Sequence, residues 1–522
     1  MRLILISIIV SSSFMSIAQY VPLGTPGLDI TQRLNNLEDS SKASVFHKVS
    51  YQNSSELYFT LLDKPIIEVS WLAPQLKMEF NSQYPYYHNN YNLLPTKGLQ
   101  SLFSTGINLE TPIFRMQIRP ELVWSQNSEY RPFSNSLPDA YWQTRYKGWN
   151  RTDAHGYFGQ ESIRRLLPGQ SYAKLHYKHF IEAGISTENI RWGPGRFGNL
   201  ILGPSTQGFN HISIGSETPI ETPLGGIEYQ VVMGRLENNN VSPIFPPEHG
   251  LNPFTINKRR EYRYFSGFSL AYHSNWLEGL SIAINLAQQQ YWSDAKDQKS
   301  YFPIGKVLFR EGDGGNDDDE IRDQVFSITG RWIWQKTKTE IYYEYGLNDS
   351  PWNFRYFSII PGHTRTYVFG ITKSLDFGEK TLLFGFENIS LSQSTLRYVL
   401  NPGSWYEHYQ IRQGLTHLGE PLGSSIPVGS DRQTIDFNLI SESNIYSIIF
   451  ERTIIDQDFS QSAFANNRRW VELAVGPKVN FQLSRLRIST QARFIKVYGY
   501  QWEVNPSITS NMNLTLNLMY QL

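Results

Sequence analysis

An aromatic ring on a stiffened backbone lies near the middle of the chain. Trp192 is followed by Gly193, Pro194 and Gly195, so the backbone has little freedom there except at the glycines. A sugar ring can stack its C–H face on such an aromatic plate while polar neighbours hydrogen-bond its hydroxyl groups. An alternative is a rigid plug loop in which the ring is a packing residue. The polar candidates of this first patch are Glu188, Asn189, Arg191, Arg196 and Asn199.

A second patch of aromatic and charged residues follows in the last third of the chain. The planar guanidinium of arginine pairs with a carboxylate through two hydrogen bonds, so an acidic polysaccharide would favour arginines at its binding site. Solvated loop charges are the plainer explanation for any one of these residues. The candidates are Trp405, Tyr406, Glu407, His408, Arg412, His417, Asp431 and Arg432.

No catalytic or metal motif accompanies these patches. The acidic run 311–320 does not have the ligand spacing of an EF-hand, which favours a solvated loop over a calcium site. The sequence contains no GxSxG, HExxH or phosphate-binding loop. Scattered His and Ser residues do not make a triad without geometry. We therefore expect no enzyme, no metal and no cofactor.

The composition narrows the class of protein. The 522 residues include 47 basic and 47 acidic side chains, which argues against a nucleic-acid partner, and there is no cysteine. Aromatic residues make up 14% of the chain, as expected where many rings lie at an apolar boundary. Residues 1–18 have the charged, apolar and small-residue order of a signal peptide, with cleavage expected after Ala18. The mature protein is therefore exported.

The elements that must position the patches are amphipathic strands. From Asn511 apolar and polar residues alternate, interrupted only by Met519, as in a strand of a transmembrane barrel. In 326–334, Ser327, Thr329 and Arg331 share one face, opposite aromatic and aliphatic residues. Trp332, Trp334 and Tyr520 are expected on the lipid-facing surface or in its aromatic girdle. Further strand patterns lie in 262–272, 280–286, 339–345, 435–439, 471–483 and 486–494.

Loop lengths also fit a barrel. With the C-terminus in the periplasm, the short connections at 484–485, 441–444, 376–380, 335–338, 275–279 and 223–225 all fall on the periplasmic side. The long connections 83–100, 126–170, 188–208, 235–260, 293–321, 347–365, 392–433, 453–468 and 499–508 all fall outside. The count gives an antiparallel outer-membrane β-barrel of about 18 strands over residues 66–522. A soluble protein with several β-sheets is the alternative.

Residues 19–65 do not follow the strand pattern. They are expected to form a periplasmic N-terminal segment with a short helix after Thr31, within 29–44. Inside the barrel, arginines recur on the inward face of the strands. They either line a lumen that attracts anions or pair with inward acids and fill it. These arginines are Arg115, Arg119, Arg263, Arg331, Arg487 and Arg493.

Ordered blocks of residues add a family resemblance. Residues 184–195, 200–202 and 218–225, then 405–408, 417–419, 421–423 and 430–431, resemble the Wzi-type capsule assembly proteins in the form found in Bacteroidetes-like bacteria. Residues 94–98 and 120–121 resemble the family's early strands, whereas 203–206 depart from its usual Asn-rich stretch. The resemblance implies an all-β barrel of 18 strands with a small periplasmic helical segment, in the best-known members a non-enzymatic lectin that holds capsular polysaccharide.

These observations lead to competing functional hypotheses. The first is an outer-membrane protein that binds and anchors surface polysaccharide, as a monomeric barrel in contact with lipid and with both termini in the periplasm. The second is a porin for anionic or sugar solutes, suggested by the inward arginines. A hydrolase would need a His-Ser-Asp constellation at the barrel mouth. The sugar itself is not readable from the sequence.

Overall fold

The fold is described from a computed structural model. It describes residues 19–20, 25, 27–40, 44, 50–51, 58–64, 66–178, 180–242, 244, 254–298, 301, 322–348, 365–393, 403–442, 444–466 and 468–520. The expected signal peptide 1–18 and the acidic run 311–320 lie outside these residues. No helix among the described residues is long and apolar enough to cross a membrane.

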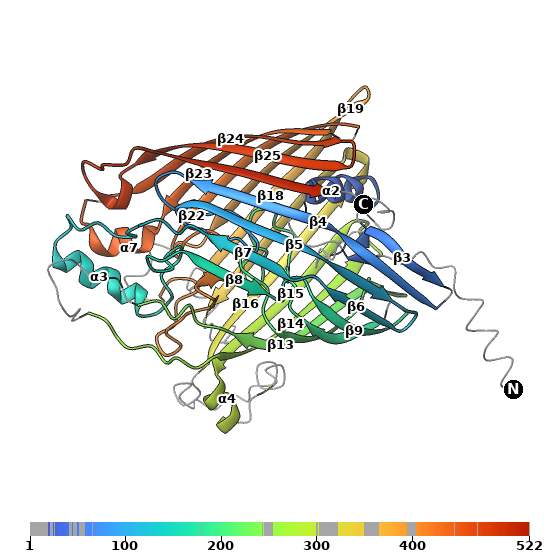
Figure 1. Ribbon diagram of the computed structural model, residues 1–522, viewed down its shortest axis with the longest axis horizontal. Coiled ribbons are helices and arrows are strands. Elements are labelled where there is room, and N and C mark those ends of the chain that lie inside the picture. The colour runs from blue at the N-terminus through green and yellow to red at the C-terminus, as the bar shows by residue number, and fades with distance from the viewer. Residues whose placement is uncertain are drawn as a thin grey trace, which may run out of the picture.

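Eighteen antiparallel strands close into one barrel, as the sequence predicts (Figure 1). Four of the eighteen are interrupted and carry two labels each: β6 with β7, β8 with β9, β11 with β12, and β26 with β3. The strands are β3 (Tyr58–Lys64), β4 (Ile67–Asn81), β5 (Gly98–Glu110), β6 (Phe114–Ile118), β7 (Glu121–Ser125), β8 (Ile163–Leu167), β9 (Tyr172–Tyr177), β10 (Ile181–Ser186), β11 (His211–Gly215), β12 (Ile220–Thr222), β13 (Gly225–Leu236), β14 (Arg263–Ser274), β15 (Leu280–Tyr291), β16 (Asp323–Trp334), β17 (Thr339–Asn348), β18 (Arg365–Phe377), β19 (Lys380–Ser390), β22 (Asp431–Ser441), β23 (Asn444–Ile455), β24 (Trp470–Leu483), β25 (Leu486–Tyr498) and β26 (Ser510–Tyr520).

Short helices and two small strand pairs complete the described structure. The strand pairs are β1 (Gln19–Tyr20) with β2 (Ser50–Tyr51), and β20 (Thr416–His417) with β21 (Glu420–Pro421). The helices are α2 (Leu28–Glu38), α3 (Asp139–Trp149), α4 (Trp292–Gln298), α7 (Gln457–Ala463) and the 3₁₀ turns η3 (Gln335–Thr337) and η5 (Tyr500–Trp502).

The last strand closes the barrel against the first. β26 pairs with β4 from Asn513 opposite Asn81 to Met519 opposite Gln75, and β3 continues along the same edge of β4. A closed barrel leaves no strand edge with unpaired backbone groups in the apolar part of a membrane.

Proline explains two of the interrupted strands. Pro120 separates β6 from β7, and Pro168 separates β8 from β9, because proline has no N–H to donate to a strand ladder. The expected loop 126–170 was too long, since β8 lies within it and pairs with β7. The strand is short and carries Arg164 and Arg165, so it gives little alternation to read.

The two faces of the strands alternate as predicted. In β16, Ser327, Thr329 and Arg331 are at most 1% exposed, whereas Ile328 is 45% exposed. In β26 Met519 is only 2% exposed, so it interrupts the polar inward face rather than the apolar outward face. The outward residues make a largely apolar belt around the barrel.

Short turns gather at one end of the barrel and long loops at the other. All the predicted short connections are turns of the structure, and β5–β6 and β9–β10 are further short connections at that end. In Figure 1 the short-turn end lies to the right, where β26 ends, and α3 and α7 lie at the opposite end.

The predicted N-terminal helix exists, but it begins earlier and enters the barrel. α2 starts at Leu28 rather than after Thr31, since Gly27 takes the left-handed conformation (φ 76°) just before the first helical turn. Ile30 and Leu37 of α2 pack against Ile333, Leu383 and Ile445 of the barrel wall. The helix therefore plugs the short-turn end of the lumen (Figure 1).

Candidate functional site

The segment between β10 and β11, which carries the first patch, folds into the barrel. Trp192 has no exposed surface, and its indole N–H donates to Oε1 of Gln230 at 2.6 Å. The ring tip faces Gly267 of β14, where a Cβ would lie 2.7 Å from Cη2. Of the two roles that the sequence left open for Trp192, the burial of the ring fits the packing residue of a plug loop.

Trp405 and Tyr406 are buried in the same way. The Trp405 indole N–H and the Tyr406 hydroxyl both donate to the carbonyl of Leu200, at 3.3 and 2.7 Å. The Tyr406 hydroxyl also accepts a hydrogen bond from the backbone N–H of Ser424 at 2.8 Å. Neither ring is more than 1% exposed, so a sugar cannot reach either one in this conformation.

The two patches meet inside the lumen and form one body. The backbone N–H of Gly203 donates to the carbonyl of Leu422 at 2.8 Å, and the hydroxyl of Ser205 donates to Pro421 and Gly423. Their apolar side chains share one buried cluster. We call residues 187–210 and 403–430 together the plug.

The polar residues of the first patch hold the plug in place. Arg196 donates two hydrogen bonds of 2.6 Å to Asp436 of β22, and both side chains are nearly without exposed surface. Arg191 pairs with Asp29 of α2 at 3.1 Å. Glu188 accepts a hydrogen bond from Lys174, and Asn199 accepts one from Arg191. Asn189 accepts a hydrogen bond from the Gln170 side chain and donates one to the Thr206 carbonyl.

The residues of the second patch are likewise occupied by internal contacts. Asp431 and Arg432 begin β22 and do not belong to the loop, contrary to the expected range 392–433. His408 and His417 each accept a hydrogen bond from a backbone N–H through Nδ1. Arg412 donates a hydrogen bond to the Asn150 carbonyl, and Glu407 accepts one from the Ser404 N–H. Asp431 accepts hydrogen bonds from the hydroxyls of Ser390 and Ser392, and Arg432 donates one to the Thr453 hydroxyl.

Five of the six predicted inward arginines contact acids, carbonyls or a hydroxyl inside the lumen. Arg33 of α2 and Arg331 share Glu340, with distances of 2.6 and 2.7 Å, and Arg33 also donates to the Pro194 carbonyl. Other such contacts are Arg115 with Glu110 and Glu217, Arg493 with Glu451, Arg119 with Ser104, and Arg263 with the carbonyls of Gly414 and Thr416.

Carboxylates gather where α7 meets the plug. Burial, next to Asp456 and Glu407, raises the pKa of Asp458 from 3.8 to about 8, and burial next to Asp456 raises the pKa of Glu407 from 4.5 to about 7. Asp458 accepts from the Ser404 hydroxyl at 2.7 Å and from the Gln393 N–H at 2.9 Å. Within the described residues, no group of three or more His, Asp or Glu is arranged to hold a metal ion.

This arrangement predicts a pH dependence of the outer loops. Because the pKa values of Asp458 and Glu407 are raised in the packed loops, these two carboxyl groups keep their protons there and lose them when the loops open. The free energy that favours the packed loops therefore falls as pH rises from about 4 to about 8. Hydrogen exchange at the amide of Phe464, corrected for its intrinsic pH dependence, should be slower at pH 5 than at pH 8. Asp458→Asn should remove most of this change; an unaltered pH profile in that variant would contradict the assignment.

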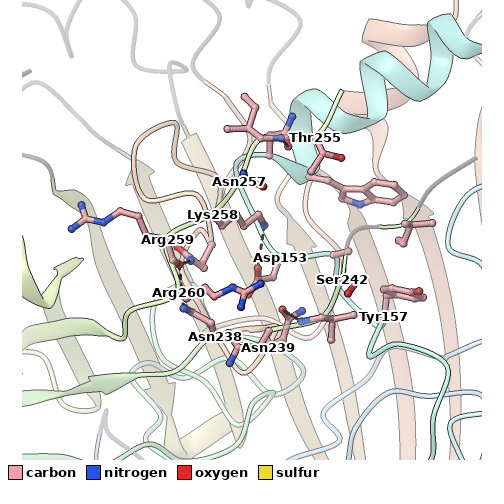
Figure 2. A pocket seen from close by; sticks show the side chains of 18 of the residues that line it. Asp153, Tyr157, Asn238, Asn239, Ser242, Thr255, Asn257, Lys258, Arg259 and Arg260 are labelled. Carbon is pink, nitrogen blue, oxygen red and sulfur yellow. Dashed lines mark hydrogen bonds and ion pairs between the residues drawn. The ribbon is translucent and has the colours of Figure 1, made fainter. Parts of the chain in front are cut away.

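A cavity of about 450 Å³ opens at the long-loop end, above the plug. Figure 2 shows it from close by, with side chains from several loops around it. Because it lies outside both predicted patches, we call it the outer pocket. It is lined by Tyr146, Trp149, Asn150, Asp153, Ala154, Tyr157, Asn238, Asn239, Asn240, Val241, Ser242, Ile244, Thr255, Ile256, Asn257, Lys258, Arg259, Arg260 and Gln413.

The outer pocket combines amides, hydroxyls, cations and aromatic rings. Lys258 donates to Asp153 at 3.1 Å, the contact drawn in Figure 2. Asn238 Oδ1 and Thr255 Oγ1 are buried and have no hydrogen-bond partner among the described residues. Buried polar atoms are usually paired, so these two favour a polar ligand or water. The exposed side chains of Asn257 and Arg260 show no hydrogen bond or ion pair with any described residue.

The pocket walls are fixed by the rest of the molecule. Gln413 of the plug donates to the Arg259 carbonyl at 2.6 Å, and its own carbonyl accepts from the Asp153 N–H at 2.9 Å. Arg145 of α3 lies over the rings of Trp149, Phe459 and Trp502. The plug is therefore the floor of the pocket, and α3 is one wall.

The outer pocket was not predicted from the sequence. The runs Asn238-Asn239-Asn240 and Lys258-Arg259-Arg260 lie at the two ends of the predicted outer loop 235–260 and were the available signal. They were not singled out because neither run contains a tryptophan. The rings come instead from Tyr146, Trp149 and Tyr157, about 100 residues earlier in the chain.

A closed barrel of eighteen strands, polar inside, apolar outside and filled by its own loops, is the architecture of a plugged outer-membrane β-barrel. Residues 82–442 match the family described as capsule assembly protein Wzi, and the chain belongs to this family.

One solved structure has the same barrel architecture. The chain is similar to a Wzi of Escherichia coli, with a TM-score of 0.56 and 12% identity over 86% of this chain and 85% of that one. It also matches OccAB4 of Acinetobacter baumannii, with a TM-score of 0.40 and 9% identity over 87% of this chain and 98% of that one. No curated protein matches the sequence.

Proposed function

We propose that this protein binds surface polysaccharide in the outer pocket and anchors it at the outer membrane, without catalysing a reaction. The observation that carries the proposal is the pocket itself, which is lined by amides, hydroxyls and three aromatic residues at the long-loop end. Of its three lining cations, Lys258 pairs with Asp153 and Arg259 pairs with Asp294 and Glu261, so the exposed Arg260 is the cation offered to a polymer that carries carboxylate groups. The E. coli protein is described as a carbohydrate-binding barrel involved in group 1 capsule assembly.

The same proposal includes the placement in the membrane. Short turns are periplasmic in barrels of this class, so the end that carries α2 and the end of β26 faces the periplasm. The outer pocket then faces the medium, where a surface polymer is found. The apolar outer belt contacts lipid, and the closed wall, with a filled lumen, needs no second copy to complete it.

A cellular experiment tests this function. Deleting the gene should lower the amount of polysaccharide retained on washed cells, measured by staining and by assay of the released polymer, while total polymer is unchanged. Complementation with the wild-type chain should restore retention. Unchanged retention in the deletion strain, together with no binding of that polymer by the purified protein, would contradict the proposal.

The plug argues against the porin that the sequence left open. α2 and the two plug segments occupy the lumen, and its arginines are engaged with acids and carbonyls. In planar bilayers we expect the wild-type protein to show no steady large conductance. A stable conductance comparable to that of an open barrel of the same strand number would contradict this reading.

A further inference from the structure

The lipid-facing wall carries a hollow at the long-loop end of β23 to β26. It measures about 620 Å³ and is lined by apolar residues together with Lys496, Ser82, Gln83, Ser510 and Asn511. The exposed fractions of its main apolar residues are large: 44% for Phe450, 42% for Leu473 and 53% for Phe494. These four strands lie side by side in the barrel.

Strand register gives the hollow its shape. One row across the wall runs Phe450, Val475, Phe494 and Met512 on β23, β24, β25 and β26. Val475 is smaller than the phenylalanines on either side of it, so the row has a low floor between two raised walls. Such a channel fits an acyl chain lying along β24.

The next outward row, toward the long loops, places two cations beside this channel. Arg452 is opposite Leu473, and Leu473 is opposite Lys496. The two cations therefore flank Leu473 from the adjacent strands, about 10 Å apart at their Cα atoms. A phosphate placed over Leu473 is within reach of both side chains.

No acid among the described residues forms an ion pair with these two cations. Arg452 donates to Gln433 at 2.8 Å and Lys496 lies near the Tyr498 ring, and neither has an ion pair with a described residue. The one outward acid on the long-loop halves of β22 to β26, within the described residues, is Asp431. Its carboxylate already accepts from Ser390 and Ser392.

The position of the pair along the strand suits a head group. A lipid-facing Arg or Lys is unfavourable at the bilayer midplane and costs little near the interface. Arg452 and Lys496 lie within the last four residues of β23 and β25, at the interface. There a phosphate would accept the forked hydrogen bonds of arginine and the point charge of lysine.

We propose that this wall is a binding site for an outer-leaflet lipid whose head group carries phosphate. The phosphate lies between Arg452 and Lys496, and an acyl chain follows the channel over Val475. Charge complementarity selects this occupant over a second copy of the chain, which would present the same two cations. The proposal does not depend on polysaccharide binding, because the outer pocket and this wall share no lining residue.

Mass spectrometry of the purified protein in detergent tests the site with lipid A as the probe. Wild-type protein should retain bisphosphorylated lipid A at least tenfold better than dephosphorylated lipid A. The Arg452→Gln/Lys496→Gln variant should lose this preference, and Val475→Trp, which fills the channel, should lower retention of both lipids. The matched control is Arg164→Gln/Lys178→Gln, which removes an exposed Arg and an exposed Lys elsewhere on the barrel and should bind as wild type does.

Several results would overturn the proposal. One is equal retention of the two lipids, and another is an undiminished preference in the Arg452→Gln/Lys496→Gln variant. Displacement of lipid A by millimolar inorganic phosphate would show that a free anion suffices and that the channel is irrelevant. Heat-modifiable migration of each variant on a gel verifies that its barrel is folded, so that lost retention is not lost folding.

Discussion

Replacing Trp405 with alanine is expected to loosen the plug by about 3–5 kcal/mol, the usual effect of removing a fully buried tryptophan side chain. The ring has no exposed surface, packs in the shared cluster and donates to Leu200, so its loss leaves a cavity between the two plug segments. The amide of Leu415, which donates to the Tyr406 carbonyl at 3.1 Å, reports this loosening. Its hydrogen exchange should accelerate at least a hundredfold, since each 1.4 kcal/mol is about a factor of ten.

Trp332→Ala is the matched control for this experiment. Trp332 faces outward beside Trp334, with ring centroids 4.6 Å apart, and does not contribute to the buried cluster of the plug. Exchange at Leu415 should therefore be unchanged in this variant. If Trp405→Ala left the exchange at Leu415 unchanged and abolished polysaccharide binding, the result would contradict the packing role of Trp405 and would assign its ring to sugar binding.

Replacing Arg196 with methionine is expected to release the plug from the barrel wall and to open a conductance. The change leaves Asp436, which is 1% exposed, without the partner that donates two hydrogen bonds of 2.6 Å. Removing one partner of a buried pair costs about 3–5 kcal/mol, because the remaining charge is not solvated. In planar bilayers the variant should show frequent openings that wild type lacks.

The double variant Arg196→Met/Asp436→Leu separates the charge from the shape of the pair. Without either charge no carboxylate is stranded, so the double variant should be closer to wild type than Arg196→Met alone. Openings of equal frequency in both variants would mean that the guanidinium acts through its bulk. A silent Arg196→Met channel would contradict an anchoring role for the pair.

Much of the barrel was predictable from the sequence, because alternation is a local property. The alternate polar residues Ser327, Thr329 and Arg331 indicate the inward face of a strand within five residues, and short turns separate the alternating runs. β8 was not predicted because it has only five residues and ends at Leu167, just before Pro168. The start of α2 was placed too late because its boundary depends on Gly27, which gives no periodic signal.

The site was less predictable, because burial of a loop is decided by distant partners. Trp192 meets Gln230 and Gly267, and Trp405 meets Leu200, contacts that no local pattern encodes. The same tryptophan beside the same glycines could equally stand exposed. The outer pocket brings together four separate stretches of the chain, around residues 150, 240, 258 and 413, which only the closed barrel places side by side.

Direct binding of the cell's own surface polysaccharide to purified pocket variants tests the central claim most directly. Asn257→Ala/Arg260→Ala removes two exposed side chains of the outer pocket, and loss of one neutral and one charged hydrogen bond should cost about 2–4 kcal/mol. Asn466→Ala/Arg469→Ala removes the same residue types from the loop before β24, away from the pocket lining. We expect the pocket variant to bind at least tenfold more weakly than wild type and the loop variant to bind equally well. Undiminished binding by the pocket variant would contradict the account.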